Sequence, residues 1–310
     1  MQRKTPLTNT KILKLNKKTA EDGPSIMNIW QEHFQQLATP TLEENFDTEK
    51  LELVEIQNNI IESIEREKGQ GIDLVNVKEV NKAIEKLKAG KAPDEDGISA
   101  EHYKHGMEEI ELTLYLATYK TPCKWGLTEG VSSLCAAFLT SEAIEESKKL
   151  KILLILITLD AEKAFDKLNH EILFNKLYHY GIKRKLWILL RNLYKGMSIK
   201  VKWEGQCTED VMVLQGIQQG AKLSTALYKC YNNVILDSIL KSGLGACIGD
   251  IQVPAPPCAD DIAALANRTA DAQGILDIVQ HHTSRDLVKI NPTKSEAVLY
   301  NAKGSNISTL

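Results

Sequence analysis

The apolar run Ile152–Leu159 constrains the fold of this chain more than any other segment, because it ends directly in a carboxylate, Asp160. A short run rich in branched apolar residues is typical of a strand buried on both faces of a sheet. A second carboxylate pair, Asp260-Asp261, lies between two further strand-like segments. If these strands are neighbours, the carboxylates converge at one edge of the sheet. There they can hold divalent cations for in-line phosphoryl chemistry.

The order of the predicted elements indicates an α+β fold. From Ile152 onward the pattern predicts a strand, helices, a hairpin, a helix, a strand–turn–strand unit, a helix and a strand. This order favours a mostly antiparallel sheet covered on one face by helices. The predicted helices span 25–37, 51–68, 77–87, 101–119, 134–149, 169–180, 184–194, 224–241 and 269–285, with Ser25 and Thr269 as N-caps. Besides 152–159, strands are predicted at 198–203, 211–214, 246–253, 261–266, 287–290 and 296–300.

Composition and charge exclude few classes of protein. The net charge of −3 and the pI near 6.2 give no support to a nucleic-acid partner, because chains that bind nucleic acid are more often basic. The cysteines form no Cys-x-x-Cys pair and no ligand-like spacing with the histidines. We therefore expect reduced thiols in an intracellular protein, nuclear or cytoplasmic. No apolar run approaches the roughly 20 residues needed to span a bilayer, so no membrane partner is expected.

Taken alone, the Asp260-Asp261 pair is more typical of an ordinary surface turn than of a metal site. The surrounding motifs reverse that interpretation, because together they resemble the palm of the reverse-transcriptase domain of a non-LTR (LINE-type) retrotransposon. The matching segments, in the family's order and at similar spacings, are Leu159–Asp166, Gln215–Ser224, Cys258–Asp261 and Asn291–Ser295. Upstream, Gly90–Tyr103 and Gly126–Lys149 are similar to the family's Gly-Lys-x-Pro-Gly-x-Asp-Gly-Ile segment and to the helix entry before the palm.

The resemblance implies a right-hand polymerase palm that performs two-metal nucleotidyl transfer. An RNA template, a DNA primer and deoxynucleoside triphosphates (dNTPs) would be its partners. Asp160, the Ala161 carbonyl, Asp260 and Asp261 would bind two Mg²⁺ ions, with Mn²⁺ as a substitute. Such donors suit Mg²⁺, which takes few protein carboxylates and completes its coordination with substrate phosphate oxygens and water.

The resemblance also implies roles for residues around the nucleotide. Phe165 would stack under the sugar and exclude a 2′-hydroxyl, although a core aromatic residue is an equally good interpretation of the sequence. Gln219 and Gly220 would line the pocket for the nucleotide and the template base, where glycine permits close approach of the main chain. Lys294 would protonate the leaving pyrophosphate; without the resemblance, a surface lysine is the better interpretation.

The N-terminal half departs from the family's pattern. Between Tyr103 and Gly126 the family carries basic stretches that grip the triphosphate, and neither stretch is present here. Losing charge-assisted phosphate contacts weakens the binding of substrate and transition state by several kcal/mol. Smaller departures are Asp94, Glu95, Gln218, Thr225 and Cys258.

We therefore expect an irregular tail at 1–24, an incomplete, largely helical fingers region at 25–150 and a palm at 151–310, with neither a thumb nor an endonuclease domain. Two alternatives to an active polymerase stay open. One is a catalytically inactive palm remnant with a nucleic-acid-binding or structural role, against which the three clustered aspartates argue. The other is a different two-metal nucleotidyl enzyme such as a cyclase, against which Gln219-Gly220 and Lys294 argue.

Overall fold

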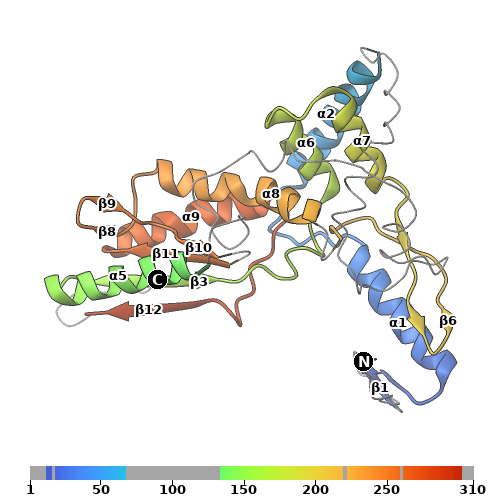
Figure 1. Cartoon of the computed structure of the whole chain (residues 1–310), viewed down its shortest axis with the longest axis horizontal. Helices are drawn as coiled ribbons and strands as arrows, with labels where there is room; N and C mark the ends of the chain where they lie inside the picture. Colours follow the sequence, from blue (N-terminus) through green and yellow to red (C-terminus); the bar gives the residue numbers. More distant parts are fainter. Residues whose placement is uncertain (1–11, 16–17, 68–132, 219–221, 259–260, 302–310) are drawn as a thin grey trace, which may run out of the picture.

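The computed structural model describes residues 12–15, 18–67, 133–218, 222–258 and 261–301. Within these ranges a sheet with long helices lies at one end of the molecule and a bundle of α2, α6 and α7 at the other, while α1 and short hairpins extend from the junction (Figure 1). The helices are α1 (Gly23–Ala38), α2 (Thr48–Glu67), α5 (Ser133–Leu150), α6 (His170–His179), α7 (Arg184–Tyr194), α8 (Lys222–Lys241) and α9 (Thr269–Arg285).

The main sheet has four antiparallel strands in the order β10-β11-β3-β12. These strands are β3 (Leu154–Leu159), β10 (Pro257–Cys258), β11 (Asp261–Ala266) and β12 (Glu296–Tyr300). Shorter pairs are β1 (Leu13–Leu15) with β2 (Lys18–Ala20), β4 (Ser198–Ile199) with β7 (Val211–Met212), β5 (Lys202–Trp203) with β6 (Gln206–Cys207), and β8 (Cys247–Ile248) with β9 (Ile251–Gln252). The predicted hairpin between 198 and 214 is confirmed as two successive pairs.

Both faces of β3 are covered, because successive side chains of a strand point to opposite sides. Ile155, Ile157 and Leu159 pack against α8 and α9. Leu154 and Leu156 pack on the other face with α5 and the β8–β9 hairpin. The predicted buried strand and the α+β class with an antiparallel sheet are thereby confirmed. The expectation that helices cover one face is incomplete, since α5 covers part of the second face.

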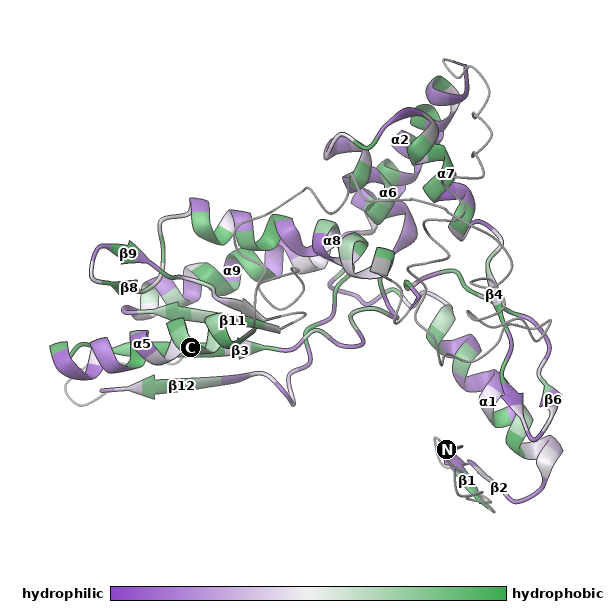
Figure 2. Ribbon diagram, viewed as in Figure 1, coloured by the Kyte–Doolittle hydropathy of each residue, from purple (hydrophilic) through white to green (hydrophobic). Residues whose placement is uncertain are grey.

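Helix α8 joins the two main hydrophobic clusters. Its first half contributes Leu227, Tyr228 and Tyr231 to a cluster with α2, α6 and α7. Its second half contributes Ile235 and Ile239 to the cluster beneath the sheet. Each of these side chains is at most 2% exposed. Along the helices hydrophobic residues alternate with hydrophilic ones (Figure 2), as a single buried stripe per helix requires. Helix α8 therefore connects the bundle rigidly to the sheet.

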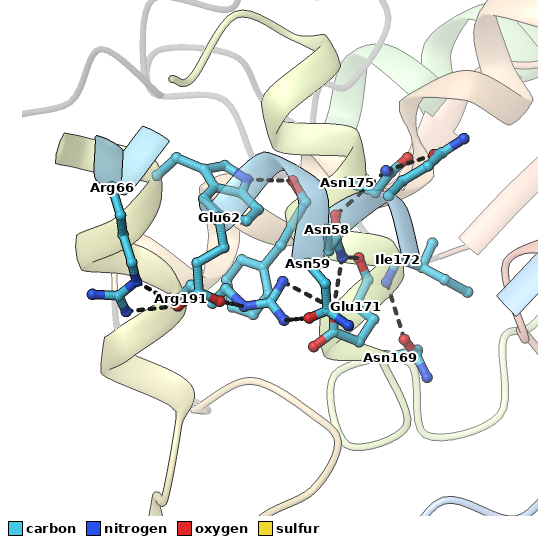
Figure 3. Close-up of polar contacts among 12 residues, drawn as sticks. Asn58, Asn59, Glu62, Arg66, Asn169, Glu171, Ile172, Asn175 and Arg191 are labelled. Atoms are coloured by element: carbon cyan, nitrogen blue, oxygen red, sulfur yellow. Dashed lines mark hydrogen bonds and ion pairs between the residues drawn. The ribbon is translucent and has the colours of Figure 1, made fainter. Parts of the chain in front are cut away.

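A polar network also joins α2 to α6 and α7 (Figure 3). Arg191 pairs with Glu62 (Nε–Oε2, 3.0 Å) and with Glu171 (Nη1–Oε2, 3.0 Å). The buried Asn58 donates from Nδ2 to the main-chain carbonyl of Glu171 (2.8 Å) and to its carboxylate (2.7 Å). An unsatisfied buried amide costs about 1–3 kcal/mol, so these bonds fix the register of α2 against the later helices.

Several boundaries differ from the predictions, each for a local reason. Asp22 caps α1 in place of Ser25, because its carboxylate accepts hydrogen bonds from the N–H and the hydroxyl of Ser25. Helix α9 begins after Arg268, which makes no capping hydrogen bond with its side chain, so the predicted Thr269 cap is wrong. The predicted strand at 246–253 is the β8–β9 hairpin, and β10 takes its place as the partner of β11.

Three further predictions have different outcomes. The strand expected at 287–290 is reduced to an isolated bridge at Ile290. The helices expected at 77–87 and 101–119 lie outside the described residues. The domain boundary at residue 150 stays a prediction; α2 and α5, on its N-terminal side, pack against elements that follow it. None of the described helices has an apolar stretch long enough to cross a membrane.

Candidate active site

Asp160 lies directly after β3, where the strand end meets the turn at 291–295. The Asp160 N–H donates to Ser295 Oγ (3.2 Å), and its carbonyl accepts from the Asn291 N–H (2.8 Å). Asn291 closes this turn, since its Oδ1 accepts from both the N–H and the hydroxyl of Thr293. Such an Asx turn replaces a main-chain partner with a short polar side chain. The lysine-bearing motif is thus docked on the strand end that carries Asp160.

Lys294 extends from the same turn towards Asp160. Its Nζ lies 3.5 Å from Asp160 Oδ1. The side chains are 66% and 25% exposed, respectively. Exposed pairs of this kind contribute at most about 1 kcal/mol, so the ammonium can readily exchange this partner for another anion. The fold therefore brings together two residues that the sequence places far apart.

The main chain of Asp261, from the second carboxylate pair, begins the neighbouring strand β11. Strand β11 runs beside β3 with Ile262 opposite Leu159. Extending this antiparallel register by one residue sets the main chain of Asp261 beside that of Asp160. Asp260 and the Asp261 side chain lie outside the described residues. Among the side chains that are described, no three acidic, histidine or cysteine groups come together as a metal site.

An open groove of about 320 Å³ lies over this end of the sheet. Its lining consists of Thr158, Leu159, Asp160, Pro256, Ile262, Ala263 and Lys294. Ligand sites commonly measure about 300–1,000 Å³, so the groove is large enough for a small ligand. Asp160 and Lys294 therefore border one common space.

The main chain after Asp160 pairs with the 289–291 segment, and the Ala161 carbonyl takes no part in this pairing. Ala161 forms an isolated antiparallel bridge with that segment. In this bridge the Asn291 N–H donates to the Asp160 carbonyl and the Glu162 N–H donates to the Lys289 carbonyl, both at 2.8 Å. Neither hydrogen bond uses the Ala161 carbonyl. Together with the Asp160 carboxylate, this carbonyl makes a donor set of oxygens, which hard cations such as Mg²⁺ prefer. The described residues thus fit the predicted metal site.

Phe165 lies in the turn that follows Ala161 and packs against α8. Its ring stacks on Tyr228, with ring centroids 4.6 Å apart and ring planes at 17°. Aromatic pairs of this geometry add about 0.5–1.5 kcal/mol beyond the area they bury. Phe165 is half-buried at the edge of the cluster around α8, so the structure supports its interpretation as a core aromatic residue.

The segment Gln215–Ile217 crosses this turn and is bonded to it. The Gly216 N–H donates to the Leu168 carbonyl (2.7 Å), and the Ile217 N–H donates to the Phe165 carbonyl (2.8 Å). Gly216 has φ +86°, and a Cβ at this position would lie 2.5 Å from the Asp166 carbonyl oxygen. Only glycine satisfies both the conformation and the space.

The predicted pocket residues Gln219 and Gly220 lie outside the described residues. Gln218, which precedes them, is exposed. Of the predicted site residues, the structure therefore gathers Asp160 and Lys294 at the groove, places Ala161 in the bridge to Ile290 and places Phe165 in the turn that follows.

Sequence reasoning missed a chain of charges beside Ala161. Glu162 pairs with Lys167 (2.8 Å) and lies 3.8 Å from Lys289, whose Nζ pairs with Glu43 (2.8 Å). The hydrogen bond from Lys167 lowers the pKa of Glu162, and the hydrogen bond to Glu43 raises the pKa of Lys289. The four residues come from three segments well separated in the sequence, so no local spacing could have revealed the whole chain.

Residues 70–308 match the family described as "Reverse transcriptase (RNA-dependent DNA polymerase)". The chain belongs to this family. The match includes every site residue that the sequence predicted, and the chemistry of this family generally uses divalent metal ions. The reverse-transcriptase palm predicted from the motifs is therefore confirmed at the level of family and fold.

Relatives of this chain come from transposable elements. The Retrovirus-related Pol polyprotein from type-2 retrotransposable element R2DM of Drosophila melanogaster is 30% identical over 139 residues, which are 44% of this chain and 13% of that protein. The Transposon TX1 uncharacterized 149 kDa protein of Xenopus laevis is 26% identical over 164 residues, 52% of this chain and 12% of that protein. The predicted non-LTR retrotransposon origin is confirmed, while the chain spans a small part of each relative.

Telomerases are found among the similar solved structures. Telomerase from Candida tropicalis with a TWJ fragment of telomeric RNA aligns with a TM-score of 0.42 at 15% identity, over 57% of this chain and 31% of that chain. Apo telomerase from the same organism, truncated from the C-terminal domain, aligns with a TM-score of 0.38 at 17% identity, over 57% and 36%.

Proposed function

We propose that this chain catalyses RNA-directed DNA synthesis, extending a DNA primer with dNTPs on an RNA template. One observation carries the proposal: Asp160, the main chain of Asp261 and the turn of Lys294 meet at one end of the sheet. These positions come from separate sequence motifs, and nothing in the packing of the sheet requires acidic residues there. Family membership supports the same reaction.

We assign the metal site to Asp160, Asp260, Asp261 and the Ala161 carbonyl, and we propose two Mg²⁺ ions, with Mn²⁺ as a substitute. Bound ions would activate the primer 3′-hydroxyl and neutralise charge on the leaving pyrophosphate. The chain itself holds the donors in place. Because the N–H and the carbonyl of Asp160 are both bonded to the 291–295 turn, its carboxylate starts from a fixed main chain.

Lys294 is the proposed proton donor for the pyrophosphate. Its Nζ is 3.5 Å from Asp160 Oδ1, so a phosphate oxygen held beside Asp160 would lie within its reach. Phe165 would lie under the deoxyribose, where its stacking on Tyr228 limits rotation of the ring. Gln219 and Gly220 would complete the pocket for the nucleotide and the template base.

A second candidate is a palm that binds nucleic acid without catalysis. The sequence between Tyr103 and Gly126 favours it, because the basic stretches that grip the triphosphate in the family are missing there. Such a protein would keep its affinity for a template–primer duplex and would extend nothing.

Primer extension on an RNA template, with dNTPs and Mg²⁺ or Mn²⁺, tests the proposal. Wild type and Asp250→Asn, an exposed residue in the β8–β9 turn, are expected to extend the primer equally. Asp160→Asn should reduce the rate of extension by about 10²-fold or more, because the proposed metal site loses one of its negative charges. Undiminished extension by Asp160→Asn would contradict the assignment. No extension by wild type, with equal duplex binding by all three proteins, would support the second candidate.

A further inference from the structure

The segment Gln215–Ile217 leads into the proposed nucleotide pocket and is held by side chains from other parts of the fold. It precedes Gln219-Gly220 by only a few residues. Because the Ile217 N–H is bonded to the Phe165 carbonyl, any shift of the segment is passed to the Phe165 turn, and the groups that hold the segment help to set where Phe165 lies.

The first of these groups is the C-terminus of α1. The side chain of Gln215, 7% exposed, donates from Nε2 to the carbonyls of Leu37 (2.8 Å) and Thr39 (3.2 Å). The Leu214 N–H donates to the carbonyl of Ala38 (3.0 Å). The last carbonyls of a helix have no partner within the helix, so Gln215 satisfies acceptors that would otherwise need water or another donor.

The second group is His170, at the start of α6. Its Nε2 lies 2.6 Å from the Gly216 carbonyl oxygen. Because a carbonyl only accepts hydrogen bonds, Nε2 must carry the hydrogen. The ring is packed beside Tyr194 and Phe174, which restrict its rotation. Burial lowers the pKa of His170, so the neutral imidazole is the form that holds the segment at pH 7.

The remaining bonds tie the same residues to the Phe165 turn. The N–H groups of Gly216 and Ile217 donate to the carbonyls of Leu168 and Phe165. The N–H of Gly216 is thus held by the Leu168 carbonyl, and the carbonyl of Gly216 is held by His170. Gln215 fixes the preceding residue to α1.

We propose that Gln215 and His170 are positioning residues for the incoming dNTP, and that α1 belongs to the nucleotide site through Gln215. The inference rests on the proposed function. The two side chains act through the main chain, because they hold the Gln215–Ile217 segment against the Phe165 turn. Their loss should therefore weaken dNTP binding more than it slows chemistry at Asp160.

The test uses two variants that remove donors, one that restores a donor and one control. Gln215→Glu keeps the shape of the side chain but places a carboxylate, which cannot donate a hydrogen bond, beside the α1 carbonyls. His170→Phe keeps the ring without its hydrogen-bond donor, whereas His170→Gln returns an amide nitrogen near the position of Nε2. Gln206→Glu makes the same chemical change as the first variant at an exposed position of β6.

In primer extension, Gln215→Glu and His170→Phe are expected to raise the KM for dNTP about tenfold and to change kcat by less than about threefold. His170→Gln and Gln206→Glu should stay close to wild type. A fall in kcat with an unchanged KM in both donor-removing variants would overturn the inference, because it would place the effect on the reaction step.

Amide hydrogen exchange of the protein without substrate gives an answer independent of activity. Exchange of the Gly216 and Ile217 amides should accelerate about tenfold in Gln215→Glu and His170→Phe, with β3 amides unchanged. Unchanged exchange at both amides would overturn the inference. If β3 accelerates as well, the variant is unfolding, and Gln215→Met replaces Gln215→Glu. A wild type that extends no primer would reject the proposed function, while the exchange comparison would still decide whether Gln215 and His170 anchor the segment.

Discussion

Two parts of the candidate site are held in different ways. The floor, consisting of Asp160, Ala161 and the 289–295 segment, is joined mainly by main-chain hydrogen bonds. The wall, consisting of Gln215–Ile217, is anchored by the side chains of Gln215 and His170 and by a glycine that nothing larger can replace. Main-chain bonds survive most substitutions, whereas side-chain anchors depend on residue identity. The floor should therefore fail only when its buried support is removed, and the wall should fail at single positions.

The largest effect is expected at Asp286, which supports the floor from below. Its carboxylate, 3% exposed, pairs with Lys176 (2.5 Å) and Lys50 (3.1 Å). Asp286 directly precedes residues 287–290, which lead to the floor. Burial lowers the pKa of Lys176, although Asp286 opposes this shift. Asp286→Ala would leave the buried Lys176 ammonium without a counter-ion, with only the Tyr231 carbonyl as a hydrogen-bond acceptor, and should lower the free energy of unfolding by about 3–5 kcal/mol.

Urea unfolding measures this loss. The control is Asp277→Ala, an exposed position on α9, which should change the free energy of unfolding by no more than about 0.5 kcal/mol. Equal stability of the two variants would show that the floor does not depend on its ionic support.

The next effect is expected in the wall, at Gly216. Gly216→Ala places a Cβ 2.5 Å from the Asp166 carbonyl oxygen at φ +86°, so both strain and overlap oppose it. We expect a loss of about 2–4 kcal/mol in the free energy of unfolding. Gly249→Ala separates the two causes, because Gly249 has φ +57° with no atom within 4 Å of the added Cβ. Gly249→Ala should lower the free energy of unfolding by only about 1 kcal/mol. Equal losses in the two variants would mean that the close contact with Asp166 is unimportant.

The smallest effect is a pH dependence that belongs to the wall. Because burial lowers the pKa of His170, the unfolded chain binds a proton at a pH where the folded protein does not. The contribution of His170 to the free energy of unfolding is therefore fully present above the unfolded pKa of about 6.5. It falls as the pH drops from there towards the folded pKa, by at most about 1.4 kcal/mol per pH unit. His170→Gln should flatten this slope. His282, whose pKa is also lowered by burial, contributes to the slope that remains. An unchanged slope between pH 6.5 and 5 in thermal or urea unfolding would contradict the burial of His170.

Sequence patterns predicted best what depends on neighbours along the chain. The run before Asp160 is a buried central strand, the helices at 169–180, 184–194 and 224–241 are confirmed within a few residues, and the predicted hairpin between 198 and 214 forms. The error at the start of α1 is also local. Asp22 caps the helix in place of Ser25, because its carboxylate lies three residues before the Ser25 N–H that it accepts from.

The sequence by itself determined the chemistry of this protein: which residues are acidic, which strands carry them, and to which family their motifs belong. These properties follow from periodicity and from motifs of a few residues. Only the tertiary structure decided what holds those motifs together. The 291–295 turn docks on Asp160, α5 covers the second face of the sheet, and Gln215 binds the end of α1 across a separation of 178 residues. Such contacts depend on how whole elements pack, and no local spacing in the chain encodes them.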